Sequence, residues 1–267
     1  MTERPRRREQ KEGDRRAAGS KRTNSHRSKQ TPKRAMTSRR RDASDDRPAS
    51  RHEAVHLSDD VIRELHAAAR PTKGDILVKV FSDAVAAYAA GDTQEAIRLG
   101  DQAKHMALRS TNVREFLGLA YYSADRWRDA ARELSAFRRI AGSTEQNPVI
   151  ADCYRALGKP DKALQLCDEV KPGTVPEPVS FEAAIVAAGA LADMGNIEGA
   201  RQRLEALSLD PSIAQEHHLR AWYVLGDLLE REGRFTQALS WFDAIAAADP
   251  GLTDAPERAA RLHRAGG

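Results

Sequence analysis

Residues 221–250, AWYVLGDLLEREGRFTQALSWFDAIAAADP, decide the fold of this chain. Gly226 and Ala238 stand where a lone amphipathic helix favours large apolar side chains, and bulky residues flank both of them. Small residues allow two helix backbones to approach closely, and large neighbours then fill the space on either side. The stretch therefore predicts two packed helices joined by a turn at Gly233, with Ala238 opposite Gly226.

Turn residues recur through the chain at intervals of 34, 33, 37 and 38 residues, and an alanine follows each turn five positions later. The turns are Gly91, Asp125, Gly158, Gly195 and Gly233, and the alanines are Ala96, Ala130, Ala163, Ala200 and Ala238. Repeats of this length indicate stacked supersecondary units that bury their apolar faces against one another. The body of the chain is therefore predicted to be all-α, with about five helix–turn–helix units.

Two of the units match the motif W-x2-L-G-x2-Y…A-x3-F…P. The last unit supplies Trp222, Leu225, Gly226, Ala238, Phe242 and Pro250, with Leu229 in place of Tyr. The second unit supplies Leu117, Gly118, Tyr121 and Ala130, with Leu134 in place of Phe.

The other three units are more degenerate, because Ala84, Ala151 and Ala188 replace the motif Gly and Tyr154 alone keeps the aromatic residue. On these residues the chain resembles the tetratricopeptide-repeat (TPR) family over about residues 77–252. A bias of 33 Arg to 10 Lys makes it similar to TPR proteins of high-GC bacteria. The resemblance implies a TPR-like α-solenoid over residues 53–267, with an extra helix from Asp59 before the repeats and a capping helix near residues 254–265.

Residues 1–52 differ sharply from this body. They carry 18 Lys and Arg against 7 Asp and Glu, a net charge of +11, whereas residues 53–267 carry a net charge of −7. Their only large apolar side chains are Met1 and Met36, so burial cannot offset the entropy of ordering them. A disordered basic tail is expected, either a sequence-nonspecific electrostatic arm for nucleic acid or the product of upstream translation before a start at Met36.

The sequence offers no motif for catalysis or for a cofactor, so we expect neither an enzyme nor a bound cofactor or metal ion. Cys153 and Cys167 are interpreted as buried small hydrophobes. His217 and His218 are interpreted as solvated, because adjacent residues on a helix point about 100° apart. The longest apolar run, residues 183–192, has about half of the roughly 20 residues that a membrane span needs. A cytoplasmic protein is expected.

By resemblance, the first helices of TPR units line a concave groove that binds a peptide or a partner helix. The implied groove is aromatic and acidic, and a non-catalytic scaffold or adaptor is the expected function. A basic peptide, or the chain's own basic tail, is the expected occupant, and nucleic-acid association through the tail is the alternative. The groove positions are Phe81, Val85, Tyr88, Glu115, Leu119, Tyr122, Asp152, Arg155, Ile185, Gly189, Tyr223, Asp227 and Glu230.

Overall fold

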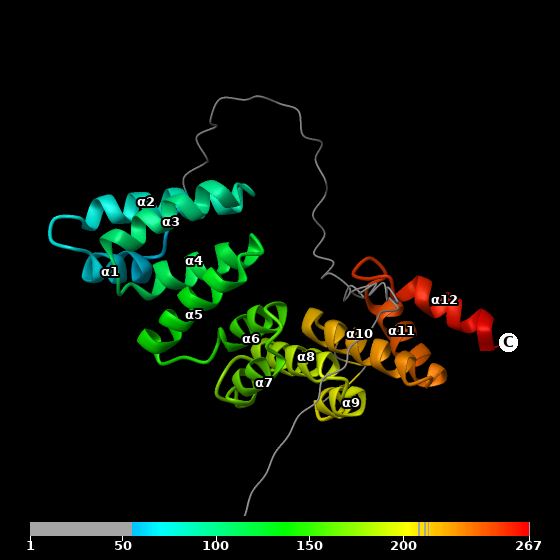
Figure 1. Cartoon of the computed structure of the whole chain (residues 1–267). Coiled ribbons are helices and arrows are strands. Elements are labelled where there is room, and N and C mark those ends of the chain that lie inside the picture. Colours follow the sequence, from blue (N-terminus) through cyan, green and yellow to red (C-terminus); the bar gives the residue numbers. More distant parts are fainter. Residues whose placement is uncertain (1–54, 208, 211, 213, 267) are drawn as a thin grey trace, which may run out of the picture. The chain divides into compact units, whose positions relative to one another are not determined.

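The computed structural model describes residues 55–266 except 208, 211 and 213, and the predicted tail of residues 1–52 lies outside the described residues. Within the described part, twelve α-helices form and no strand is assigned. Ten of the helices make five successive pairs (Figure 1). The pairs are α2 (Gly74–Ala89) with α3 (Thr93–Met106), α4 (Thr111–Ser123) with α5 (Trp127–Ala141), α6 (Asn147–Ala156) with α7 (Pro160–Asp168), α8 (Glu177–Asp193) with α9 (Ile197–Glu205), and α10 (Glu216–Arg231) with α11 (Phe235–Ala248).

Two further helices flank the pairs. Helix α1 (Asp59–Ala68) packs on α2, and α12 (Ala255–Gly266) packs on α11. Ser58 is the residue that precedes α1, but its side chain makes no capping hydrogen bond. The Pro-rich loop before α8 ends at Pro176, so Glu177 already lies in the first turn of that helix.

The five predicted turns have the left-handed backbone that ends a helix sharply. Their φ angles are 84° at Gly91, 58° at Asp125, 71° at Gly158, 84° at Gly195 and 74° at Gly233. The alanine that follows each turn by five positions is fully buried in all five pairs. Four of the turns use glycine because a residue without a Cβ reaches this conformation with little strain.

In four of the five pairs the side-chain volumes at two fixed positions, the motif Gly position and the residue sixteen positions later, compensate each other: where the first is glycine the second is large, and where the first is alanine the second is small. A Cβ added to Gly226 would lie 2.8 Å from Cε1 of Phe242, and one added to Gly118 would lie 2.5 Å from Cγ of Leu134. The side-chain atoms nearest to a Cβ at Gly226 belong to Phe242, and Ala238, predicted opposite Gly226, is fully buried. Where alanine replaces the motif Gly, at Ala84 and Ala151, the matching residues are the smaller Gly100 and Cys167; Ala188, paired with Leu204, is the exception.

The apolar core runs from pair to pair instead of closing within each one. One cluster of buried side chains joins α1 to α4, a second joins residues from α3 to α8, and a third joins α8 to α12. The alanine-rich helix α8 contributes to the second and third clusters, which explains why it is apolar on more than one face. No helix among the described residues is long and apolar enough to cross a membrane.

Candidate partner-binding site

The predicted groove residues all lie on the first helices of the pairs, α2, α4, α6, α8 and α10. Side-chain hydrogen bonds connect successive first helices along this face. The Tyr88 hydroxyl lies 2.7 Å from Oγ of Ser123 on α4, and the Tyr122 hydroxyl donates to Asp152 on α6 at 2.6 Å. Arg155 on α6 then donates to Asp193 on α8 at 2.9 Å.

Two of the predicted groove positions do not present a surface. Phe81 is only 4% exposed and meets the ring of Phe116 edge-on, so its side chain belongs to the core. A Cβ on Gly189 would overlap Cζ of Arg155, so the absence of a side chain there lets the guanidinium lie across α8. Val85, Leu119 and Ile185 are half-buried against the core clusters.

The acidic groove residues already have partners within the chain. Glu115 accepts a hydrogen bond from Gln146 at 2.7 Å, and Asp152 accepts one from Arg155 at 3.2 Å. The reason for expecting a basic occupant is therefore weakened, because such a ligand has to displace the chain's own side chains.

The strongest of these internal contacts is at α12. The Arg258 side chain, only 12% exposed, donates to Asp227 at 3.1 Å and to Glu230 at 2.5 Å. Its guanidinium also lies 4.4 Å from the centroid of Phe242 and 5.4 Å from that of Tyr223. Burial opposes its charge, but the hydrogen bond to Glu230 and the nearby acids leave the pKa of Arg258 raised.

A cleft that the sequence did not predict lies beside α5. It has a volume of about 750 Å³, and five cationic side chains and no carboxylate line it. Three of the cations, Arg128, Arg139 and Lys159, have no carboxylate partner among the described residues. The cationic side chains that line it are Arg114, Arg128, Arg132, Arg139 and Lys159.

Two of the arginines that line the cleft, Arg114 and Arg132, pair with a buried carboxylate. Glu133 is 1% exposed and pairs with Lys104 at 3.2 Å, Arg132 at 3.1 Å and Arg114. Burial alone would raise the pKa of Glu133, but the hydrogen bond from Arg114 and the charge of Lys104 outweigh it and lower the pKa. The second pair thus holds a buried carboxylate surrounded by cations, whereas the carboxylates of the fifth pair surround the nearly buried cation of Arg258.

The sequence contains a pattern of basic residues that indicates the cleft, but this pattern lies on a helix that the family resemblance does not place in the groove. Arg128, Arg132, Ser135 and Arg139 lie on α5 at spacings of four, three and four residues, which places them on one face. Helix α5 is the second helix of its pair, and the predicted groove considered only first helices.

Comparison with known proteins identifies the repeat. The tetratricopeptide-repeat family model matches residues 185–253, which span the second half of α8 and the whole of α9, α10 and α11. Together with five turn-and-alanine pairs spaced 33–38 residues apart, that match decides the assignment. The fourth and fifth pairs of this chain carry tetratricopeptide repeats.

Solved TPR structures share the fold at low sequence identity. The MamA protein has a TM-score of 0.52 and 17% identity, covering 66% of this chain and 93% of that one. A thermophilic TPR protein in Thermus thermophilus has a TM-score of 0.52 and 17% identity, covering 70% and 99%. The nearly identical TPR-like repeats of a Podosopora anserina putative kinesin light chain have a TM-score of 0.52 and 18% identity, covering 65% and 94%.

These likenesses concern the fold alone. No curated protein matches the chain in sequence, and the expected similarity to TPR proteins of high-GC bacteria is not shown.

The two cysteines of the third TPR unit are buried and free. Burial raises the pKa of Cys153 and of Cys167 to about 12, so both thiols stay protonated at neutral pH. A protonated, buried thiol is neither a good nucleophile nor a good metal ligand.

The two histidines of the fifth TPR unit are not solvated, and that prediction was wrong. His218 is 3% exposed and the side chain of His217 is 11% exposed. The angle between adjacent helical residues does not keep the rings apart, since their centroids lie 4.2 Å from each other and both rings meet Phe181 of α8. Burial and the charge of His217 lower the pKa of His218.

Proposed function

We propose that this TPR protein is a non-catalytic interaction scaffold that binds an acidic segment of a partner protein in the basic cleft beside α5. The observation that carries the proposal is the lining of that cleft, with five cationic side chains and no carboxylate. Arg128, Arg139 and Lys159 supply charge that no described carboxylate neutralises. Guanidinium groups bind carboxylates through two parallel hydrogen bonds, which favours an Asp- or Glu-rich peptide.

A peptide fits the cleft better than a nucleic acid does. Binding of single strands without sequence preference uses aromatic side chains on which the bases stack. The aromatic residue that lines the cleft is Tyr154, and its ring is covered by the ammonium of Lys162 at 4.0 Å from the centroid. Ala131, Ala136 and Leu157 provide apolar lining that suits peptide side chains.

The face of the first helices is the second candidate surface, for a peptide or a partner helix. Eleven of the twelve side chains predicted there keep part of their surface exposed, Phe81 being the buried one. Tyr88 is the most accessible aromatic among them, at 37% exposed. A partner here would compete with the internal hydrogen bonds of Tyr122, Asp152 and Arg155.

Fluorescence anisotropy with labelled peptides tests the proposal on the full chain. A Glu-rich peptide of about 12 residues, long enough to cross a cleft of ordinary ligand size, should bind and a Lys-rich one should not. The triple substitution Arg128→Glu, Arg139→Glu and Lys159→Glu should abolish binding, because each reversal replaces an attractive contact with a repulsive one.

A charge-matched control separates the cleft from general charge. The triple substitution Arg70→Glu, Arg109→Glu and Arg264→Glu changes three exposed arginines outside the cleft and should leave binding within about twofold. Equal losses in both triple variants would contradict a specific cleft. Tighter binding of a single-stranded oligonucleotide than of the acidic peptide would favour the nucleic-acid alternative.

A further inference from the structure

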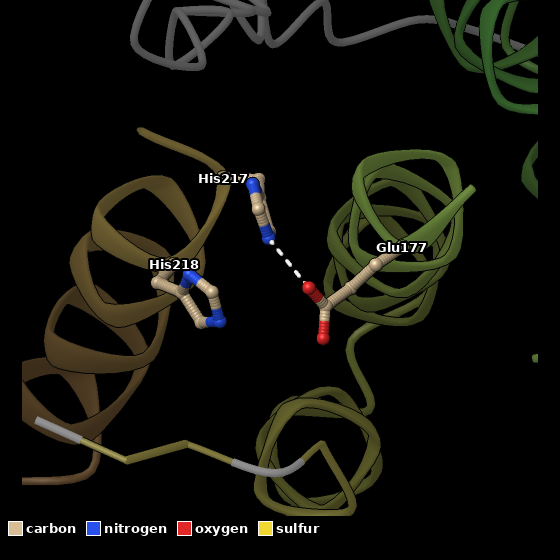
Figure 2. A group of neighbouring side chains, drawn as sticks. All are labelled: Glu177, His217 and His218. Atoms are coloured by element: carbon tan, nitrogen blue, oxygen red, sulfur yellow. Dashed lines mark ion pairs between the residues drawn. The ribbon is translucent and has the colours of Figure 1, made fainter. Parts of the chain in front are cut away.

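Three potential metal ligands meet where the fourth and fifth TPR units touch. Glu177 lies in the first turn of α8, and His217 and His218 lie in the first turn of α10 (Figure 2). One ring nitrogen of each histidine and a carboxylate oxygen of Glu177 all lie within 4.8 Å of one another. Nε2 of His217 lies 3.5 Å from Oε2 of Glu177.

Two nitrogen atoms of this group are buried and unsatisfied. Nε2 of His217 and Nδ1 of His218 have no hydrogen-bond partner, although His218 is only 3% exposed. A buried polar atom left without a partner costs about 1–3 kcal/mol, and such atoms are rare in native proteins. Two of them beside one carboxylate indicate a polar ligand that both rings can bind.

The surrounding apolar rings hold the histidines in place. Phe181 meets His217 at 4.9 Å and His218 at 4.7 Å between centroids, edge-on in both cases. The ring centroid of Trp222 lies 6.5 Å from that of His218. By contrast, the Glu177 side chain is 63% exposed. Two ligands on a tetrahedral zinc ion lie roughly 3.3 Å apart, given Zn–N and Zn–O bonds near 2.0–2.1 Å. The 3.5 Å between Nε2 of His217 and Oε2 of Glu177 is already close to that spacing.

We propose that Glu177, His217 and His218 bind a divalent transition-metal ion, foremost Zn²⁺, between α8 and α10. Two imidazoles and one carboxylate suit zinc, and three protein ligands leave a fourth position open. That position is taken by water or by a donor from a bound partner. The ion joins two successive units, so it stabilises the α8–α10 contact.

Zinc binding to the full chain is measured by competition with a chromogenic chelator, after the protein has been treated with EDTA. The wild type should bind about one equivalent of Zn²⁺, and the thermal midpoint should rise with the ion. Glu177→Gln and His217→Ala should each weaken binding by at least about 10-fold, since even groups that only support metal ligands contribute roughly 10- to 100-fold. Co²⁺ should give visible absorption bands that both variants lose.

His263→Ala is the matched control, because His263 also lies 3.2 Å from a carboxylate, that of Asp243, but on the exposed surface. This variant should bind Zn²⁺ like the wild type. Because Glu177 is exposed, Glu177→Gln is expected to keep its helicity, which circular dichroism verifies. No binding by the wild type, or equal binding by the wild type, Glu177→Gln and His263→Ala, would overturn the proposal.

Discussion

The second and fifth TPR units each hold a buried or nearly buried charged side chain surrounded by charges of opposite sign, but the central charge is negative in one unit and positive in the other. In the second unit a buried acid, Glu133, is surrounded by Lys104, Arg114 and Arg132. In the fifth unit a nearly buried cation, Arg258 of α12, is surrounded by Asp227 and Glu230 and by two aromatic rings. Both clusters join a unit to a helix outside it, but they leave different charges on the surface.

The two clusters differ in the charge that remains unpaired near them. Around Glu133, Lys104 and Arg132 also pair with Asp101 and Asp129. Two further cations on α5, Arg128 and Arg139, line the basic cleft without a carboxylate partner among the described residues. Around Arg258 the carboxylates are matched by Arg231, Arg258 and Arg261, so little negative charge is left free. The net negative charge of residues 53–267 therefore does not prevent a basic cleft, and the carboxylates of Asp227 and Glu230 are paired within the chain.

Loss of the buried acid should be the most damaging change. Glu133→Gln removes the buried charge that Lys104, Arg114 and Arg132 share, and Arg114 then has no carboxylate partner among the described residues. Breaking a buried ion cluster in this way costs about 3–5 kcal/mol. Urea denaturation at pH 7 measures the loss. Glu198→Gln, an exposed carboxylate on α9, is the control and should change stability by less than about 0.5 kcal/mol.

The pH dependence gives a second test of Glu133. Its pKa in the folded protein lies below its ordinary value of 4.5, so its contribution is present above about pH 4.5 and is lost as the pH falls through the lower folded value. The stability gap between wild type and Glu133→Gln should therefore narrow on acidification. A gap that stays constant down to about pH 3, well below the ordinary Glu value, would contradict the proposed ionisation.

Overpacking the helix contact of the fifth unit should have the next largest effect. Gly226→Leu forces a side chain against Phe242, which is fully buried and has no room to move, and overpacking costs about 1–3 kcal/mol. Gly233→Ala only strains a turn with φ of 74°, at about 1 kcal/mol. Equal losses in the two variants, measured by chemical denaturation, would show that Phe242 can move away from Gly226.

Removal of the central cation of the fifth unit should cost about 2 kcal/mol, because Asp227 and Glu230 keep some contact with water. Arg258→Ala should also expose α12 to proteolysis at residues that the wild type protects. Arg264→Ala, on the same helix and without an ion partner among the described residues, should be neutral. Equal behaviour of the two variants would mean that the ion cluster does not hold α12.

The smallest effect is expected from deletion of residues 1–52. Since the carboxylates of α10 are paired by α12, the basic tail has no free acidic cluster there to stabilise. The thermal midpoint should change by no more than about 2 °C, which corresponds to the energy of a few weak surface contacts. A much larger fall in scanning calorimetry would show that the tail packs on the repeats.

Short-range patterns made the fold predictable. Each turn and its alanine lie five residues apart, so the spacing alone located the five pairs, and all five turns have positive φ. The side-chain partners were not predictable in the same way. Arg258 and Asp227 are 31 residues apart, and no local pattern links them.

The prediction that His217 and His218 are solvated was wrong for a related reason. A helical wheel separates His217 from His218, but side-chain rotation and the ring of Phe181 on another helix bring both rings together. The basic cleft was not predicted because the family resemblance places the groove on first helices, whereas the arginines of the cleft lie mainly on α5, a second helix.

The position of Arg258 also limits how the protein can be lengthened. An additional repeat inserted between α11 and α12 would separate Arg258 from Asp227 and Glu230, so the inserted unit has to offer two carboxylates at the same places, one and four residues after its motif Gly. A duplicate of the fifth unit meets this condition. A duplicate of the third unit does not, because Arg155 occupies the second place and would face Arg258 with like charge. Tandem duplication is therefore compatible with this C-terminal junction only for some units of the chain.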